Sequence, residues 1–300
     1  MATQMSLIGV GTIFLGLSSG GPLYDVGQVD EFKLEVSEEI KKLRNYQTGI
    51  GLADQVSMIE AVTASLKFRS ISAANMALAM RGGVESLASG TVSNQSHTAY
   101  AGGFLPLDGI APTAVSVTVD PVAWTATGAQ VVGAIVKPGT GTHFYRCTVA
   151  GTTAATEPTW PTDGSTVTDG TVTWQDMGTM ALSANEFQTN PAGLYIPEAS
   201  TKIAATGTPV KVSYSKSAGD VIQTLINSGE EYRIFFSGRN TARSGKALAV
   251  DLFRVKFSAT KDLSFIGDDF AAMPLTAEVL RDESKTGEGI SQFCTIKMAV

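Results

Sequence analysis

The sequence predicts a mainly β protein with one short helix, and three observations support this fold class. Apolar and polar residues alternate strictly in segments 32–37, 64–69, 210–215 and 252–257, which is typical of strands with one buried and one solvated face. The 31 glycines and 11 prolines supply turns between such strands. Hydrophobic residues make up 43% of the chain and charged residues 17%, which excludes a disordered chain.

The first element is an apolar run over residues 7–17 (LIGVGTIFLGL), which we interpret as a strand. The first basic residue is Lys33, so the run lacks the basic segment that precedes the apolar part of a signal peptide. At about eleven residues it is also too short to span a bilayer. Gly9 and Gly11 are followed by Phe14, where a dinucleotide-binding motif needs its third glycine. The sequence therefore predicts no targeting segment, membrane anchor or nucleotide loop here.

One segment departs from the period of two and predicts the helix. Residues 72–81 (SAANMALAMR) are rich in good helix formers. Ser72 is suited to cap the start, and Gly82 with Gly83 is suited to end the helix in a left-handed conformation.

Residues 119–180 differ in composition from the rest of the chain and predict a separate small module. All three tryptophans lie there, and the only basic residues are Lys137 and Arg146. Asp163-Gly164 and Asp169-Gly170 flank a short β-rich segment, and Asp-Gly is a strong hairpin signal. We expect a division into a first part of the main domain (1–118), an inserted all-β module (119–180) and a second part of the main domain (181–300). The tryptophans, Phe144 and Tyr145 are expected to form the core of the module.

Residue types that carry chemistry are scarce, and the sequence predicts no catalytic residue, no metal site and no cofactor. His97 and His143 have no second histidine, cysteine or carboxylate at ligand spacing, so we expect both to be exposed or structural. Cys147 and Cys294 are expected to be free thiols. The acidic pairs at 38–39 and 268–269 match no calcium loop and are interpreted as solvated or partner-facing.

The aromatic residues of the module have two interpretations. Exposed Trp124, Tyr145, Trp160 and Trp174 would be able to stack on sugar rings. Alternatively, these four side chains form the core of a module that has few other large residues. The sequence leaves both open.

The order of segments along the chain resembles the major tail tube proteins of long-tailed bacteriophages. The resemblance covers most of residues 20–118 and 181–300. It is carried by FKLEVSEE within 24–39, KLRNYQTG at 42–49, SMIEAVTASLK at 57–67, the helix with Asn75 and Gly82, GFLPL at 103–107, the segments 186–197 and 209–214, and the closing stretch 232–257 with Gly238, Asn240, Thr241, Asp251 and Leu252.

The module at residues 119–180 resembles a second family, a small module of phage tail and fibre proteins that is similar to chitin-binding-type carbohydrate-binding domains. The motifs that carry this resemblance are Tyr145-Arg146-Cys147, ATEPTWP at 155–161 and TDGTVTW at 168–174.

The first resemblance implies a β-sandwich or barrel tail-tube fold with the module on its outer surface. It implies a structural virion protein, not an enzyme, whose hexameric rings stack into the conduit for DNA ejection. Its partners would be further copies of itself and other tail proteins: the tape measure, the tail terminator and the distal tail or baseplate proteins. No membrane is implied; the protein would be assembled in the host cytoplasm and located in the virion tail. The alternative is a carbohydrate-binding tail fibre or baseplate adhesin.

Residues 40–55 are expected to form a long loop that reaches a neighbouring ring, because loops at this position do so in the family. The contact residues would be Lys41, Lys42, Arg44, Asn45 and Tyr46. The three basic side chains would be able to pair with acidic surface such as that at 268–269.

The charge balance is compatible with a passage for DNA. Lys and Arg number 22 against 28 Asp and Glu, which gives a formal net charge of −6. DNA carries about one negative charge per 1.7 Å, and a basic groove would hold it through its phosphates. A neutral or acidic lining lets the duplex slide, and we expect only transient, non-specific contact with DNA.

Overall fold

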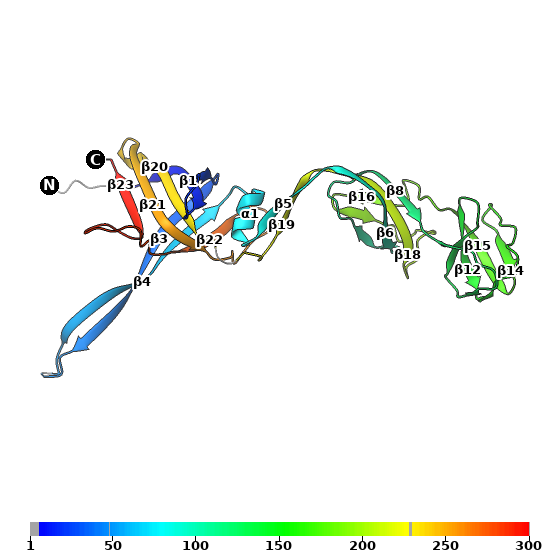
Figure 1. Cartoon of the computed structure of the whole chain (residues 1–300), viewed down its shortest axis with the longest axis horizontal. Coiled ribbons are helices and arrows are strands. Elements are labelled where there is room, and N and C mark those ends of the chain that lie inside the picture. Colours follow the sequence, from blue (N-terminus) through cyan, green and yellow to red (C-terminus); the bar gives the residue numbers. More distant parts are fainter. Residues whose placement is uncertain (1–5, 48, 228–229, 300) are drawn as a thin grey trace. The chain divides into compact units, whose positions relative to one another are not determined.

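The computed structural model describes residues 6–47, 49–227 and 230–299. The chain forms two compact units: unit 1 comprises Met1–Glu85 and Asp220–Val300, and unit 2 comprises Ser86–Gly219. Strands β5 (Gly83–Leu87) and β19 (Gly219–Gln223) pair with each other where the chain passes between the units (Figure 1).

Unit 1 is built on an eight-stranded sheet with the order β2-β1-β20-β21-β22-β4-β3, in which β23 also pairs with β21. The predicted alternation is confirmed in β4, where Ala64, Leu66 and Phe68 are buried between partly exposed residues. These side chains join β22 and β21 in one core cluster. The strands of this sheet are β1 (Gly9–Leu17), β2 (Tyr24–Asp25), β3 (Val29–Arg44), β4 (Leu52–Phe68), β20 (Tyr232–Asn240), β21 (Lys246–Phe257), β22 (Met273–Val279) and β23 (Cys294–Met298).

The predicted helix is present as α1 (Ala73–Ala79), and its ends show one correct and one wrong expectation. Ser72 caps the start by accepting a hydrogen bond from the backbone N–H of Asn75 at 3.1 Å. The left-handed residue at the other end is Arg81, with φ of 49°, and not Gly82. Gly82 instead allows a close approach of the backbone, because a Cβ there would lie 2.2 Å from the carbonyl oxygen of Gln223. A turn of 3₁₀ helix also occurs in this unit, over Thr241–Arg243.

The first part of unit 2 is a small sandwich of two three-stranded sheets. One sheet has the order β6-β18-β8 and the other the order β16-β17-β7. Both contribute to a single core that includes Val212 and Tyr214 of β18 and Leu194 of β17. The strands are β6 (Gly90–Ala99), β7 (Phe104–Pro106), β8 (Thr113–Val119), β16 (Gln188–Asn190), β17 (Gly193–Tyr195) and β18 (Thr208–Lys216).

The second part of unit 2 is the predicted module, which has its own sheet of order β14-β15-β12-β11-β9 and a separate pair, β10 with β13. Asp169 pairs with Val172 across the predicted turn, and Gly170 has φ of 61°, so this hairpin is confirmed. The strands are β9 (Val122–Ala123), β10 (Ala129–Gln130), β11 (Ile135–Lys137), β12 (His143–Val149), β13 (Gly151–Thr152), β14 (Thr166–Asp169) and β15 (Val172–Thr179).

The boundaries of the compact units differ from the expected division at 118/119 and 180/181. Residues 86–118 and 181–219 pair with each other through β6, β8 and β18, so they build a core separate from that of unit 1. The module shares unit 2 with this sandwich. Phe144, expected in the core of the module, packs into the core of the sandwich instead.

The mainly β fold class with one short α-helix is confirmed. The expected barrel is not formed by a single chain, since none of the sheets in the described ranges closes on itself. The large sheet of unit 1 has open ends, and β3 at one end pairs only with β4 among the described strands.

Candidate assembly surface

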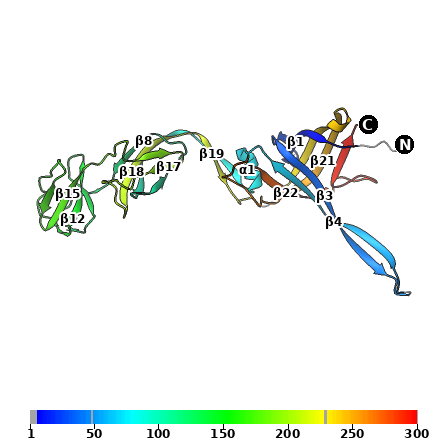
Figure 2. The same ribbon diagram turned by 180° about the vertical axis from the view of Figure 1, so that it is seen from behind.

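The segment expected to be a long loop is the outer half of a hairpin. Strands β3 and β4 pair from Val29 with Phe68 to Arg44 with Leu52, and the hairpin extends away from the rest of the sheet (Figure 1 and Figure 2). Residues 40–44 and 52–55 are therefore strand, which corrects the loop prediction. The pairing continues past a bulge at Glu60 of β4, where Ser37 pairs with Ala61 and Glu38 with Ile59. Residues 38–44 do not alternate strictly, because they are exposed and no buried face constrains their pattern.

We define the arm as residues 36–60 of this hairpin. Among its described residues only Asn45 is partly buried, and all the others are exposed. The inner half of β4 differs, since alternate residues from Val62 onward are buried. The arm nevertheless carries many large exposed apolar side chains, which are Val36, Ile40, Leu43, Tyr46, Ile50, Leu52, Val56, Met58 and Ile59. An apolar surface of this length is typical of a protein interaction site.

The end of the arm is a turn organised by Asn45. Its N–H donates to the carbonyl oxygen of Gly51 at 3.2 Å, and its carbonyl oxygen accepts from Gly49 at 3.0 Å. Its side-chain oxygen also accepts from the N–H of Gln47 at 3.0 Å. Gly49 and Gly51 both have positive φ, as a tight turn requires. These bonds hold the two strands of the arm in register up to its end.

The five residues expected to contact a neighbouring ring all lie on the arm. Lys41, Lys42 and Arg44 are at the end of β3, and Asn45 and Tyr46 begin the turn. Lys41 lies 3.8 Å from the carboxylate of Glu39. No carboxylate among the described residues pairs with Lys42 or Arg44. The structure thus brings these residues together on one projecting element.

A second exposed apolar segment of unit 1 was missed at the sequence level. In the loop 261–270, Phe265 is 79% exposed, Ile266 94% and Phe270 92%. The sequence drew attention to the acidic pair of this loop but not to the three apolar side chains beside it. The available signal was a group of large apolar residues with neither strand nor helix periodicity.

The ends of this loop are fixed to the body of unit 1. Thr260 donates its N–H to the carbonyl oxygen of Ala79 at 2.7 Å and its hydroxyl to that of Pro274 at 2.8 Å. At the other end, Arg69 donates to the carbonyl oxygen of Phe270 at 2.8 Å and forms an ion pair with Asp30 at 2.6 Å. The exposed middle of the loop therefore projects from a fixed base.

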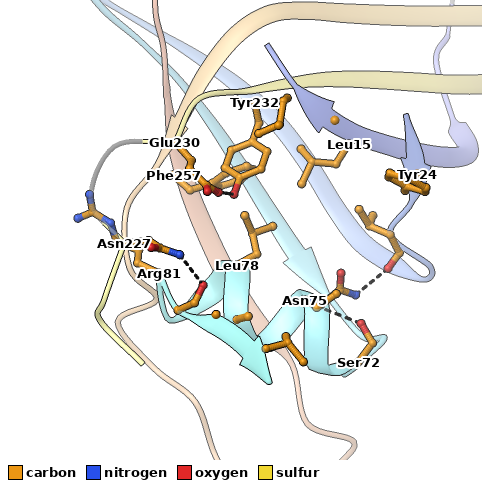
Figure 3. A pocket seen from close by; sticks show the side chains of 18 of the residues that line it. Leu15, Tyr24, Ser72, Asn75, Leu78, Arg81, Asn227, Glu230, Tyr232 and Phe257 are labelled. Atoms are coloured by element: carbon orange, nitrogen blue, oxygen red, sulfur yellow. Dashed lines mark hydrogen bonds between the residues drawn. The ribbon is translucent and has the colours of Figure 1, made fainter. Parts of the chain in front are cut away.

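Unit 1 also contains a pocket of about 750 Å³ between α1 and the strands β1, β2 and β20 (Figure 3). Leu15, Leu78 and Phe257 supply much of its apolar lining. Asn75 and Tyr232, two of the polar residues of the lining, have hydrogen-bond partners within the chain. The side-chain N–H groups of Asn75 donate to the carbonyl oxygens of Val26 and Ser70, both at 2.8 Å, and the hydroxyl of Tyr232 donates to Glu230.

The titratable residues that line this pocket include Tyr232. Burial, followed by the hydrogen bond and charge of Glu230, raises the pKa of Tyr232 above its usual range. A phenol that loses its proton less readily is a poor base precursor at neutral pH. Tyr232 is therefore not activated as a nucleophile or general base.

Residues of the distinctive sequence motifs of the module take part in a buried hydrogen-bond network around Asp169. Its carboxylate is 1% exposed and accepts bonds from the indole N–H of Trp124 at 2.8 Å, the indole N–H of Trp174 at 3.0 Å and the N–H of Ala154 at 2.8 Å. A buried carboxylate is tolerated when such donors replace its hydration. The Asp-Gly-Thr-Val-Thr-Trp motif therefore has a structural role here: it supplies both the buried carboxylate and one of its donors.

The four aromatic residues considered for sugar binding are divided by the structure. Trp174 is 0% exposed and Tyr145 1% exposed, so neither presents a ring to a ligand. Trp124 and Trp160 are partly exposed and pack against the core of the module. The ring of Trp160 lies 4.2 Å from that of Tyr145, and its indole N–H donates to Glu157 at 2.8 Å. The core interpretation accounts for Trp174 and Tyr145.

The two histidines do not converge on a common site. His143 lies 2.9 Å from Asp176, whose carboxylate also accepts the N–H groups of Gly164 and Gly178. This arrangement holds the end of β15 against neighbouring turns. His97 lies in β6, where its Nε2 is buried without a partner among the described residues. Cys147 is buried, Cys294 is partly buried, and both are free thiols.

Clusters that would suit a metal ion are absent from the described ranges. The helical segments that the structure describes are also too short or too polar to cross a bilayer.

Exposed apolar side chains are distributed unequally between the two units. In unit 2 they are Tyr100, Phe104, Ile110, Val122, Val131, Val132 and Val149. All the other large exposed apolar residues belong to unit 1, and the arm and the 261–270 loop carry many of them. Unit 1 is therefore the better candidate for an assembly surface.

Comparison with known families places the chain in one of them. The family described as "protein of unknown function UCP028589" matches residues 6–134 and 146–297, and the chain belongs to this family. The match extends through most of the module, so the family model describes the module as well as the segments around it. No curated protein matches the chain.

Proposed function

We propose that the protein is a structural subunit of a phage tail tube, in which rings of six copies stack into a conduit for DNA. The observation that carries this proposal is the arm, a paired hairpin whose outer residues are exposed and rich in large apolar side chains. A monomer gains nothing from such a surface, and water contact with it is unfavourable. Burial against further copies removes that cost.

The open sheet of unit 1 supports the same proposal. Strand β3 lies at one end of the strand order and leaves a long row of backbone groups without a neighbouring strand among the described residues. Free edges of this kind favour pairing with another chain. When the sheets of several copies join edge to edge into a closed ring, every edge is covered.

The charge of the chain agrees with a passage for nucleic acid. A net charge of −6 gives no excess of cations to hold phosphates, and DNA passing through would make only transient, non-specific contacts. In this proposal the partners are further copies, the tape measure, the tail terminator and the distal tail or baseplate proteins. The protein performs no catalysis, is assembled in the host cytoplasm and ends in the virion tail.

Negative-stain microscopy of the purified full chain over a range of concentrations tests the proposal. We expect rings with a central hole and stacks of such rings. The matched control lacks the arm: residues 38–60 are replaced by Asn-Gly, which joins Ser37 to its partner Ala61 by a two-residue turn. This variant keeps the buried half of the hairpin and is expected to remain folded without forming tubes.

Other outcomes would contradict the proposal. Monomers or compact trimers at every concentration would exclude a tube subunit. Retention of the full chain on a polysaccharide column, without rings, would instead support an adhesin. The burial of Tyr145 and Trp174 gives that alternative little aromatic surface.

A further inference from the structure

We propose that the tip of the arm, residues 40–55, docks on the 261–270 loop of a second copy of the chain. This inference rests on the proposed function and names the contact through which copies join.

The charges of the two surfaces are opposite. The tip carries Lys41, Lys42 and Arg44 against Asp54, a net charge of +2. The loop carries Asp262, Asp268 and Asp269 against Lys261, a net charge of −2. Within the described ranges, none of the three loop carboxylates forms an ion pair, and neither do Lys42 and Arg44. Each surface therefore holds charge that a partner is able to neutralise.

Both surfaces also combine this charge with exposed apolar side chains. On the tip these include Leu43, Ile50 and Leu52, which are 54%, 82% and 53% exposed, and on the loop they are Phe265, Ile266 and Phe270. Aromatic anchors surrounded by charged residues are typical of the centre and rim of a protein interface. Phe265 and Phe270 are the anchors of the proposed contact.

The tip is the outer end of the β3–β4 hairpin, and the 261–270 loop is fixed beside the inner end of that hairpin. The two surfaces therefore cannot meet within one chain. Arg69 fixes Phe270 beside Asp30, at the base of β3. Lys42 lies twelve residues further along that strand, which corresponds to about 40 Å at about 3.3 Å per residue. Half of the ten-residue loop, even when fully extended, reaches less than about 20 Å from its fixed ends.

A contact between unlike ends of identical copies is heterologous. Such contacts repeat from copy to copy and generate either closed rings or extending stacks. Each copy would offer one tip and one loop, so every tip and every loop inside the assembly is covered.

Charge reversal with complementation tests the proposal. Variant T carries Lys41→Glu, Lys42→Glu and Arg44→Glu, and variant L carries Asp262→Lys, Asp268→Lys and Asp269→Lys. Assembly is followed by sedimentation and negative-stain microscopy at about 50 mM salt, where screening is weak. We expect each variant alone to need at least a tenfold higher concentration to assemble than the wild type.

The decisive measurement is an equal mixture of T and L. In the mixture a T tip meets an L loop and an L tip meets a T loop, so assembly is expected to return to wild-type levels. A single chain with all six reversals is also expected to assemble. The control carries Glu198→Lys, Glu283→Lys and Glu288→Lys, three exposed acidic residues outside both surfaces, and is expected to behave as the wild type.

The outcomes separate this inference from the proposed function. If the wild type forms tubes and T and L also form them unaided, or if folded T and L fail to assemble when mixed, the docking contact is wrong while the tube function stands. Circular dichroism confirms that the variants are folded. If the wild type assembles into a form without a central hole, the mixture still decides the contact, whereas the tube function fails. A wild type that stays monomeric overturns both.

Discussion

The arm of unit 1 and the module of unit 2 use large apolar and charged side chains in opposite ways. In the module, Trp174 and Tyr145 are buried, and the carboxylate of Asp169 accepts hydrogen bonds from three donors of the same chain. On the arm, the large apolar side chains are exposed, and Lys42 and Arg44 have no carboxylate partner among the described residues. The polar and aromatic groups around Asp169 are satisfied within the module, whereas the arm has the composition of half an interface.

The largest expected effect comes from removing the apolar surface of the arm. The variant Ile40→Ser, Leu43→Ser, Leu52→Ser and Val56→Ser is expected to lose rings and tubes completely, because no apolar surface remains to be buried between copies. Its thermal unfolding is expected to match the wild type, since all four residues are exposed and surface substitutions change stability by only about 0.5 kcal/mol.

A matched set of substitutions controls this experiment. Val122, Val131, Val132 and Val149 are equally exposed residues of the module, and their replacement by serine is expected to leave tubes intact. Tubes in the arm variant, or loss of tubes in the module variant, would reverse the roles assigned to the two regions.

The next effect is the loss of the buried tryptophan of the module. Trp174→Ala is expected to destabilise the module by about 3–5 kcal/mol, because it leaves a cavity in a closed core. Since the only tryptophans of the chain are in the module, the fluorescence of Trp124 and Trp160 reports its unfolding specifically. Tubes are expected to persist, and their loss in this variant would show that assembly depends on a folded module.

A smaller effect is expected at alkaline pH. Burial, with a contribution from the charge of Asp176, raises the pKa of Tyr145 to about 12, whereas an unfolded tyrosine has a pKa of about 10. The folded state therefore favours the neutral phenol. The resulting stabilisation is complete below about pH 10 and is lost towards pH 12, by roughly 2–3 kcal/mol in total.

Denaturant unfolding followed by tryptophan fluorescence measures this pH dependence. Tyr145→Phe is expected to remove the decline between pH 10 and 12. It also removes the hydrogen bond to the carbonyl oxygen of Pro161, which lowers stability at every pH at which the wild-type phenol keeps its proton. An unchanged decline in the variant would assign the titration to another group.

The smallest effect on assembly is expected from removing unit 2 altogether. Deleting only the module would remove Phe144 from the core of the sandwich, so the better excision is 86–219. Because β5 and β19 are paired, a short glycine-rich turn is able to join Glu85 to Asp220. The remaining unit 1 is expected to form tubes as the full chain does. A folded unit 1 that forms no tubes would assign an essential part of assembly to unit 2.

Local patterns made much of the fold predictable. The alternation at 64–69, the cap at Ser72 and the Asp169-Gly170 turn each depend on a few neighbouring residues, and all are present. The module was recognisable because its tryptophans and turn signals lie close together in the sequence. The five expected contact residues lie on one element for the same reason, since they are consecutive or nearly so along the chain.

Other features depend on distant partners and were missed. Residues 40–44 show no strict alternation because they are exposed, and only their pairing with residues 52–57 of β4 reveals them as strand. Phe144 joins a core formed by strands on both sides of the module. The requirement for glycine at position 82 comes from its close approach to the carbonyl oxygen of Gln223, whereas the left-handed residue is Arg81.

The sequence by itself determined a mainly β chain with one capped helix, a tryptophan-rich module and few residues suited to catalysis. Those properties follow from composition and from periodicity within short segments. Only the tertiary structure decided which apolar residues are left uncovered. Ile40 and Leu66 belong to the same hairpin, but Leu66 lies in β4 between β3 and β22, whereas Ile40 lies in β3, which pairs with β4 alone among the described strands. Burial depends on neighbours that are distant in sequence, and it is this difference that makes the arm the candidate assembly surface.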